Sequence, residues 1–350
     1  MRKIFNKIAV ATIATVSFAA CTEVDICTSE LHPHLATVDI SYDWNGVTMS
    51  DSMLVMPYRI VNEWSCVYIC TPDGGAGHYI DKRPDSVFTN DAGELFTIKT
   101  GETRFLTFNY NPANVAYAYS NVSSSEAIMN NTVKVRYKSY SLESSVMKQY
   151  YGNDFISADT TKNNYVLNGD LFPHVYSQYT GIIDVENGSN KIEFAPKSIF
   201  NNYEFNFDIS AEGVTVNKVL ASLSGVPYSY NMTTCKPETS RVCNVLFGVT
   251  NNGGSKYTGT ATVLGLQRSS DSTISRGPGC IQLAIYVTDA EGNDKVYNLL
   301  INLYNYIPGI DRLQYGKDCT YNIDAPIVIT NDGVETSKGA ASWKFLNLSL

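Results

Sequence analysis

"IQLAIYVTDAEGNDKVYNLLINLY", residues 281–304, reads as two strands joined by a tight turn. Each flank is rich in β-branched and aromatic residues, which favour strands over helices. The segment "DAEGND" between them, residues 289–294, supplies the Asp, Gly and Asn that tolerate positive φ angles at a hairpin tip. The stretch therefore predicts an antiparallel β-hairpin.

Alternation of apolar and polar residues extends this prediction to other parts of the chain. In "VDISYDW", residues 38–44, Val, Ile, Tyr and Trp fall on one face of an extended strand, and Asp, Ser and Asp fall on the other. The run "YEFNFDI", residues 203–209, repeats the pattern with Tyr, Phe, Phe and Ile against Glu, Asn and Asp. A period of two indicates half-buried antiparallel strands.

Turn-forming clusters separate such runs, and helical patterns are few. The clusters are "NDAGE" (90–94), "ENGSN" (186–190), "NNGG" (251–254) and "NDG" (331–333). Only "SSEAIMNN" (124–131) and "SLESSVMKQYYG" (141–152) are compatible with a short helix each. The sequence therefore predicts an all-β protein built from sandwiches.

The chain length and the strand pattern indicate two domains. A chain of 350 residues is long enough for two separate cores. The two alternating runs that resemble first strands begin near residues 36 and 203, and Pro196 lies where one sheet can close before the next opens. We expect an N-terminal β-sandwich over residues 36–197 and a C-terminal β-sandwich over residues 198–350.

The first residues have the features of a bacterial lipoprotein signal peptide. Arg2, Lys3 and Lys7 make a basic start, and an apolar stretch then ends in "FAAC". This stretch is too short to span a bilayer, and small residues directly before a cysteine mark the lipoprotein cleavage site. We therefore expect residues 1–20 to be the signal peptide, Cys21 to be the lipidation site and residues 21–35 to be a lipidated tether. The alternative is an ordinary secreted protein with a free thiol at Cys21.

The charge balance excludes one class of partner. The chain has 26 Lys and Arg against 34 Asp and Glu, a net charge of −8, and three of its basic residues belong to the signal peptide. An acidic surface offers no footprint for nucleic acid and is repelled by anionic lipid. We therefore expect no nucleic-acid partner, and we expect attachment to the outer membrane to come from the lipid on Cys21.

The cysteines and histidines near the start suggest a metal site at first sight. Cys21, Cys27, His32 and His34 lie close together, but a thioether-linked sulfur at Cys21 is no longer a thiolate ligand. Pro33 and the short tether favour a spacer that leads into the first strand. We expect no metal and no cofactor, with a three-ligand zinc site as the alternative.

The other cysteines do not form a disulfide framework. Lipidation of one of the eight cysteines leaves an odd number. Cys66 and Cys70 lie about 13 Å apart along an extended strand, which is too far to bridge. Cys235 and Cys243, across a predicted hairpin, are the pair most compatible with a disulfide.

Catalytic signatures are absent from the sequence. No H-E-x-x-H or G-x-S-x-G motif occurs, and Ser224 in "LSGVP" lacks a strand–turn–helix context. "PDGGAGH", residues 72–78, lacks the Lys-Ser/Thr of a phosphate loop, and "DAEGND" lacks the distal Glu of a calcium loop, so both predict turns. We therefore expect a non-enzymatic protein.

Two alternatives remain open. Carboxylate pairs of a polysaccharide hydrolase can lie far apart in a chain, so spacing alone does not exclude them. The 24 tyrosines are compatible with a platform on which sugar rings stack, and equally with packing on half-wet sheets. A surface glycan-binding lipoprotein is the main alternative.

Several stretches together resemble the fimbrial anchor and minor-subunit lipoproteins of Bacteroidales, namely the FimB-type branch of the fimbrillin superfamily and related uncharacterised lipoproteins. Where that family has a Gly-x-Tyr segment, this chain has Thr103 in place of the Tyr. The stretches that carry the resemblance are "CTEVDICTSELHPHLATVDISYDW" (21–44), "TGETRFLTFNYNPANVAYAYSN" (100–121), "APKSIFNNYEFNFDI" (195–209), "LASLSGVPYSYNM" (220–232), "ATVLGLQ" (261–267) and the hairpin to residue 307.

The resemblance implies two tandem transthyretin-like β-sandwich domains and a role at the cell surface in anchoring or capping a fimbria-like polymer. It also implies fimbrillin-like subunits as partners and assembly by β-strand addition. Between Cys21 and Arg59 the chain has no Arg or Lys. An Arg- or Lys-directed protease of the kind thought to mature polymerising fimbrillins has no cleavage site there, so Cys21 should stay joined to the fold.

Overall fold

The computed structural model describes most of the chain after residue 34. The described residues are 35–44, 53–61, 64–67, 87–89, 94–109, 115–119, 133–152, 164–168, 175–274, 276–307, 313–336 and 346–347. The predicted helix at 124–131 and the predicted turn at 72–78 lie outside these residues. Strands dominate what is described, as the alternating sequence patterns predict.

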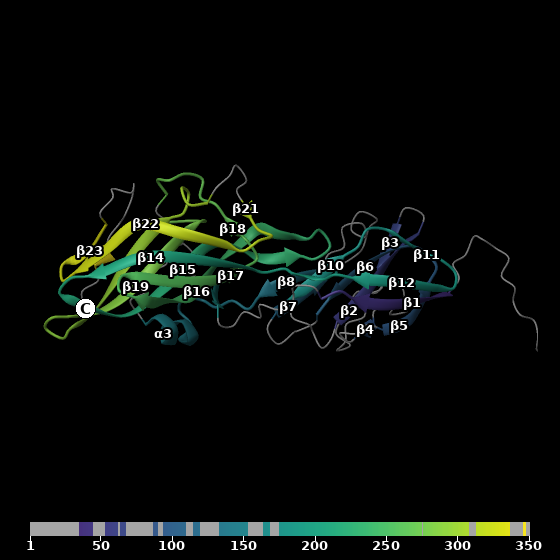
Figure 1. The fold of residues 1–350 in the computed structure, drawn as a ribbon, viewed down its shortest axis with the longest axis horizontal. Helices are drawn as coiled ribbons and strands as arrows, with labels where there is room; N and C mark the ends of the chain where they lie inside the picture. The colour runs from purple at the N-terminus through teal and green to yellow at the C-terminus, as the bar shows by residue number, and fades with distance from the viewer. Residues whose placement is uncertain are drawn as a thin grey trace, which may run out of the picture.

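The molecule is elongated, with two groups of sheets lying end to end (Figure 1). The sheets that contain the first strands lie at one end, and a large sheet built mostly from the second half of the chain lies at the other. We refer to these as the N-terminal and C-terminal regions.

Two sheets make up the N-terminal region. The first has the order β12-β1-β5, and the second has the order β13-β10-β6-β2-β3, with β11 beside β6 and β4 beside β2. The strands are β1 (Leu35–Tyr42), β2 (Met53–Val61), β3 (Trp64–Val67), β4 (Val87–Thr89), β5 (Glu94–Lys99), β6 (Gly101–Phe108), β10 (Tyr176–Tyr179), β11 (Ile183–Val185), β12 (Ser189–Phe194) and β13 (Lys197–Ser198).

A compact apolar cluster joins these two sheets. Val38 and Ile40 of β1 meet Phe105 of β6 and Phe194 of β12, and each of these side chains is almost fully buried. The rings of Phe105 and Phe194 lie edge to face, with centroids 6.2 Å apart. The apolar face predicted for residues 38–44 is therefore the face that packs into this core.

The C-terminal region is one 12-stranded sheet that folds around a single core. Its order is β23-β22-β14-β17-β16-β15-β19-β20-β24, with β7, β8 and β9 attached beside this path. A separate two-stranded sheet pairs β18 with β21. The strands are β7 (Val115–Tyr119), β8 (Val133–Tyr137), β9 (Tyr165–Leu167), β14 (Asn201–Ala211), β15 (Val214–Asn231), β16 (Lys236–Gly253), β17 (Lys256–Val263), β18 (Leu266–Gln267), β19 (Cys280–Asp289), β20 (Asp294–Asn302), β21 (Leu313–Gln314), β22 (Cys319–Thr330), β23 (Gly333–Thr336) and β24 (Leu346–Asn347).

The hairpin predicted from residues 281–304 is confirmed. β19 and β20 pair antiparallel from Cys280 opposite Asn302 to Thr288 opposite Asp294. The predicted strand at residues 203–209 is the middle of β14, where Tyr203 and Phe205 are fully buried and the residues between them are partly exposed.

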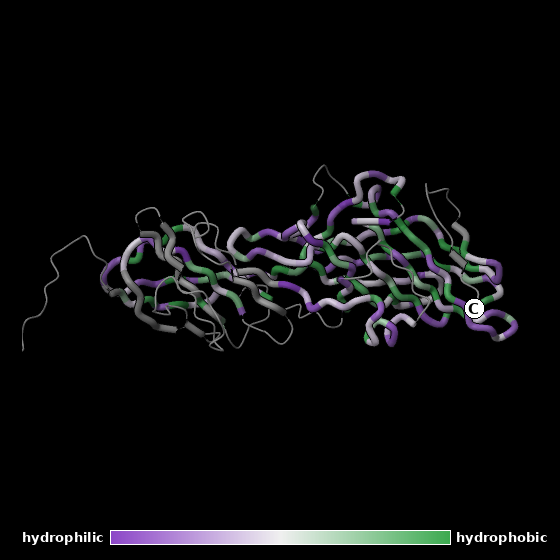
Figure 2. Tube along the Cα trace, turned by 180° about the vertical axis from the view of Figure 1, so that it is seen from behind, coloured by the Kyte–Doolittle hydropathy of each residue, from purple (hydrophilic) through white to green (hydrophobic). Residues whose placement is uncertain are grey.

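Aromatic side chains fill the C-terminal core between its two layers. Phe205 of β14 stacks on Phe247 of β16 at 5.9 Å between centroids, and on Tyr321 of β22 at 5.3 Å. Figure 2 shows hydrophobic residues concentrated along the strands of this region. Leu106 and Phe108 of β6 also belong to this cluster, so the two cores meet at β6.

A strap formed by the described residues 133–152 and 164–168 pairs with strands of the C-terminal sheet and packs against it. It contains β8, the helix α3 (Ser145–Tyr151) and β9. The side chain of Ser144 caps α3 by accepting a hydrogen bond from the backbone N–H of Met147. This helix confirms the one predicted within residues 141–152.

The strap is fastened to the sheet by buried contacts. Met147 and Tyr151 of α3 pack with Leu220 and Leu246 of the sheet. The Tyr151 hydroxyl donates a hydrogen bond to the backbone oxygen of Ala221 at 2.8 Å. A segment that the sequence analysis placed in the N-terminal sandwich therefore pairs with C-terminal strands, and the domain boundary near residue 198 stays a prediction.

Two sequence-based expectations about pairing need correction. β1 and β14 each pair antiparallel on one edge and parallel on the other, because alternation reports which face is buried and not the direction of the neighbour. The pair most compatible with a disulfide does not form one, because Cys235 and Cys243 are both free. Cys243 is buried against the core, whereas Cys235 lies exposed in the turn after β15.

Candidate functional site

The strand that follows the predicted tether is held on both edges. β1 is the central strand of its sheet, with six registered residue pairs to β12 and six to β5. Ladder hydrogen bonds on both edges therefore hold β1 in place. Cys21, Cys27, His32 and His34 precede the described residues, so their roles remain predictions.

A groove with polar walls lies on the outer face of the C-terminal sheet. It encloses about 470 Å³ and lies between β14, β17 and β22. Pairing of β14 with β22 is regular up to Phe207 opposite Ile323 and resumes at Ile209 opposite Ile327. β22 therefore has extra residues at this point, a β-bulge that interrupts the ladder and re-aims side chains such as Asp324.

Side chains from the four strands β14, β16, β17 and β22 form a hydrogen-bonded row along this groove. Asn206 Nδ2 donates to Asn322 Oδ1 at 3.0 Å and to Glu204 Oε1 at 3.2 Å. The Thr258 hydroxyl donates to Asn206 Oδ1 at 2.7 Å, and Asn252 Nδ2 donates to the Thr258 hydroxyl at 2.8 Å. Because the strands beneath are rigid, these polar groups are held in fixed positions.

Two carboxylates and one ammonium group line the same groove. Lys256 Nζ lies 2.9 Å from Asp208 Oδ2, and hydrogen bonds from Ser255 and Lys256 hold the pKa of Asp208 below its usual range. The Tyr306 hydroxyl donates to Asp324 Oδ1 at 3.0 Å. Burial, with the Asp324 carboxylate nearby, raises the pKa of Tyr306 to about 12. Asp208 therefore stays ionised and Tyr306 stays neutral at pH 7.

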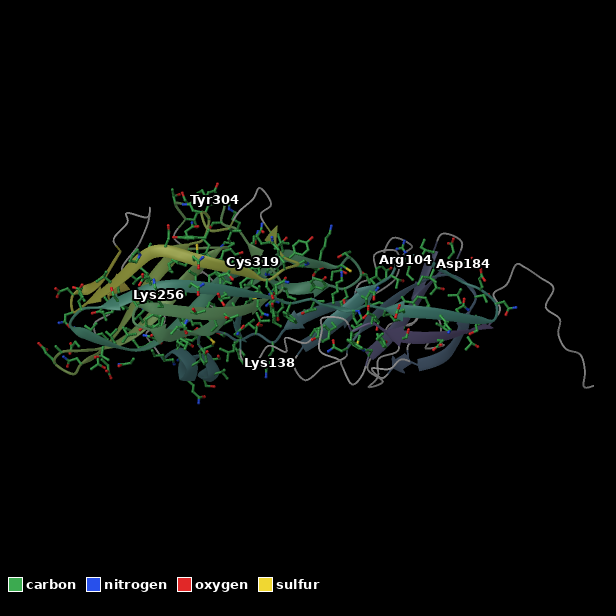
Figure 3. All side chains as sticks on the ribbon, in the orientation of Figure 1. Arg104, Lys138, Asp184, Lys256, Tyr304 and Cys319 are labelled. Atoms are coloured by element: carbon green, nitrogen blue, oxygen red, sulfur yellow. The ribbon has the colours of Figure 1, made fainter. Side chains whose placement is uncertain are left out.

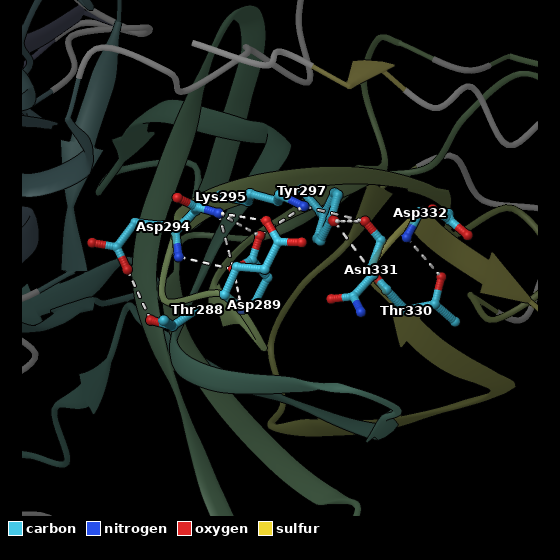
Figure 4. Close-up of polar contacts among 10 residues, drawn as sticks. Thr288, Asp289, Asp294, Lys295, Tyr297, Thr330, Asn331 and Asp332 are labelled. Atoms are coloured by element: carbon cyan, nitrogen blue, oxygen red, sulfur yellow. Dashed lines mark hydrogen bonds and ion pairs between the residues drawn. The ribbon is translucent and has the colours of Figure 1, made fainter.

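The "DAEGND" segment is a turn in which nearby N–H groups donate hydrogen bonds to the Asp289 carboxylate (Figure 4). Asp289 Oδ1 accepts hydrogen bonds from the backbone N–H groups of Asn293 at 2.8 Å and Glu291 at 2.9 Å. Lys295 Nζ lies 3.1 Å from Asp289 Oδ2. These contacts, the Asn293 N–H first, hold the pKa of Asp289 well below its usual range. The predicted turn is confirmed.

Ser224 is built into the fold and is not exposed for attack. It is fully buried, and its hydroxyl donates to the backbone oxygens of Gly277 and of Cys280, the latter at 2.9 Å. Among the described residues, no group of three His, Cys, Asp or Glu side chains is placed to hold a metal ion. In the same residues, no helix has the length and apolar character needed to cross a membrane.

The described tyrosines are used mainly for packing. Tyr137, Tyr151 and Tyr203 are buried, and burial raises the pKa of each phenol well above 10. Tyr315 is the one described tyrosine among the exposed large hydrophobic residues, at 40 % exposure. Tyr137, Tyr151 and Tyr203 are therefore core residues and cannot belong to an exposed stacking platform.

The groove was not predicted from the sequence. Its residues come from four separate strands, and the residues of no single strand form a motif. The only signal in the sequence was the polar half of an alternating strand, Glu204, Asn206 and Asp208, which any solvent-facing strand shares.

Comparison with known proteins relates the fold to surface proteins of Bacteroidales. No family model and no curated sequence matches this chain. A solved structure of a candidate adhesin from Bacteroides ovatus superposes with a TM-score of 0.52 at 17 % identity, covering 87 % of this chain and 94 % of that one. A candidate cell adhesion protein from Bacteroides eggerthii has a TM-score of 0.43 at 11 % identity, covering 90 % and 94 %. The fimbrial anchor protein Mfa2 from Porphyromonas gingivalis has a TM-score of 0.40 at 10 % identity, covering 90 % and 98 %.

The fold assignment rests on the Bacteroides ovatus protein. The likeness extends over 87 % of this chain and 94 % of that one, so the overall fold is shared. The resemblance that the sequence motifs indicate is confirmed at the level of the fold, and the all-β architecture is confirmed with it.

Proposed function

We propose that this chain is a non-enzymatic outer-membrane lipoprotein at the cell surface, where it serves as a fimbrial anchor or accessory subunit. The observation that carries the proposal is the position of β1. Residues 22–34, which contain no Lys or Arg, separate Cys21 from a strand that is paired on both edges. A pulling force on the lipid is therefore transmitted to β1, the central strand of its sheet.

The shared fold supports the same proposal. The Bacteroides ovatus protein with this fold is described as a candidate adhesin. Fold alone does not fix function, so the lipidated cysteine has to supply the specific test. Two or three acyl chains on Cys21 give firm attachment, because each buried methylene contributes about 0.8 kcal/mol.

The Cys21→Ala variant tests the anchor, and Cys27→Ala is its matched control. Both substitutions remove a thiol from the same tether, but only Cys21 follows the "FAA" of the signal peptide. We expect Cys21→Ala to move the protein from the membrane fraction to the soluble fraction, and Cys27→Ala to leave it in the membrane. A Cys21→Ala protein that stays in the membrane contradicts the anchor.

Assembly by strand addition forms the second part of the proposal. One edge of β22 pairs with β14, whereas the other pairs with β23 only from Ile327 onward. Residues 319–326 therefore have no ladder partner on that edge among the described strands. Such an edge is a template for an added strand, where main-chain hydrogen bonds give affinity and alternate side chains set the register.

Hydrogen exchange can test this edge in the assembled polymer. We expect amides in residues 319–326 to exchange at least tenfold more slowly in protein isolated with its surface polymer than in free protein. β14, which is paired on both edges, serves as the internal reference and should not change. Equal exchange of residues 319–326 in both forms contradicts strand addition at β22.

A further inference from the structure

The groove between β14, β17 and β22 has the size and polarity of a small-molecule site. Its volume of about 470 Å³ falls within the range of roughly 300–1,000 Å³ that is typical of ligand pockets. The walls are formed by strands, with the β-bulge of β22 on one side and the β16–β17 hairpin on the other. The groove is therefore preformed and does not depend on a loop closing over it.

The polar row leaves specific hydrogen-bonding groups facing outward. Asn322 uses Oδ1 to accept from Asn206, so its Nδ2 group keeps its donors. Asn252 uses Nδ2 to donate to Thr258, so its Oδ1 atom keeps its acceptor capacity. Asp208 adds carboxylate acceptor capacity beside the Lys256 ammonium group. Donors and acceptors therefore alternate over a short distance on a rigid surface.

The charge of the groove selects against anions. Three acidic residues lie in or beside the groove: Glu204, Asp208 and Asp324. The basic residue in its lining is Lys256, which forms an ion pair with Asp208. A phosphate, sulfate or carboxylate ligand would meet like charge here. Pro326 adds an apolar ring to the lining of the groove. A matching ligand is uncharged, presents neighbouring hydroxyl groups and has one apolar face.

We propose that this groove is a binding site for a neutral glycan. A pair of ring hydroxyls can both accept from an amide and donate to a carboxylate, which is the combination that Asn322 and Asp208 present. The groove belongs to the region away from the tethered end: Lys256 and Asp184 lie in opposite halves of the molecule (Figure 3). A membrane-held protein would therefore present the groove outward. Only this orientation rests on the proposed function, whereas binding itself does not.

Affinity gels test the site with the full chain extracted in detergent. Gels contain mannan, dextran, arabinogalactan or xylan as neutral probes, and polygalacturonate or chondroitin sulfate as anionic probes. The test variant is Asn322→Ala and the control is Asn202→Ala. Asn202 lies on β14, is exposed, and accepts one side-chain hydrogen bond, from Thr262 at 3.0 Å, but does not line the groove.

We expect at least one neutral polysaccharide to retard the protein, with affinity about tenfold weaker for Asn322→Ala and within twofold of wild type for Asn202→Ala. Thermal melting of each variant confirms that it is folded. Several outcomes overturn the site: no retardation by any neutral probe, retardation by the anionic probes alone, or equal losses in both variants. Membrane release by Cys21→Ala is measured separately, so failure of the groove and failure of the anchor are distinguishable.

Discussion

The two regions of this molecule differ in the length of their strands and in the way their sheets enclose a core. In the C-terminal region β15 and β16 each span 18 residues and bend around one continuous core. In the N-terminal region no described strand exceeds the 9 residues of β2, and two separate sheets share a small cluster. The C-terminal region also recruits the strap from the first half of the chain. We infer that the C-terminal region is the stable platform and the N-terminal region is the link to the membrane.

The largest expected effect comes from two separate variants, each of which removes one buried aromatic ring from one region. Phe205→Ala opens the aromatic stack with Phe247 and Tyr321, and Phe194→Ala opens the contact with Phe105. Each substitution should cost about 3–5 kcal/mol of unfolding free energy, because both side chains are fully buried.

Hydrogen exchange then shows which strands each variant loosens. Phe205→Ala should speed exchange in the C-terminal sheet and in the strap while β1 and β12 stay protected, and Phe194→Ala should do the reverse. If both variants loosen both regions equally, the molecule is one cooperative unit and the comparison fails.

A smaller loss of stability is expected when one hydrogen bond between the strap and the C-terminal sheet is removed. Tyr151→Phe removes the buried hydrogen bond to the Ala221 oxygen but keeps the ring in place. We expect a loss of about 1–1.5 kcal/mol, seen first as faster exchange in α3. Tyr304→Phe is the control. The Arg268 Cζ atom lies 3.9 Å from the centroid of the Tyr304 ring, and this stacking contact does not need the hydroxyl group that the substitution removes. Equal behaviour of the two variants would show that the strap is not held by Tyr151.

The smallest effect concerns the turn at Asp289. Because the pKa of this carboxyl is lower in the folded than in the unfolded chain, its stabilising effect is present above about pH 4 and is lost as the pH falls toward the folded value. Asp289→Asn should lower the melting temperature at pH 7, and the gap to wild type should narrow at pH 3. A gap that is the same at both pH values would show that the charge of Asp289 does not stabilise the turn.

The sequence was most informative where one strand face is buried and the other is wet. Residues 203–209 follow this rule and were predicted with their buried face, whereas the hairpin at 281–304 was predicted from its strand-forming flanks and its turn residues. Alternation does not encode which strand lies alongside, so the parallel pairs β1–β12 and β14–β22 were missed. The strap was missed as part of the C-terminal sheet because its docking depends on contacts such as that of Tyr151 with Ala221, far apart in the chain.

The two candidate sites, Cys21 and the groove, also differ in how far the sequence could predict them. Cys21 was predicted from a local pattern, because lipoprotein processing reads a short contiguous segment. The groove depends on the strand register that places Asn206 between Thr258 and Asn322, and on the bulge that follows in β22, and neither has a signature in a single sequence.

Mass spectrometry of the N-terminal peptide from membrane-extracted protein tests the central claim most directly. The account predicts that the mature chain begins at Cys21, and that this residue carries a thioether-linked diacylglycerol and an acylated amino group. A mature chain that begins at an unmodified Cys21, at a later residue or at residue 1 would contradict it.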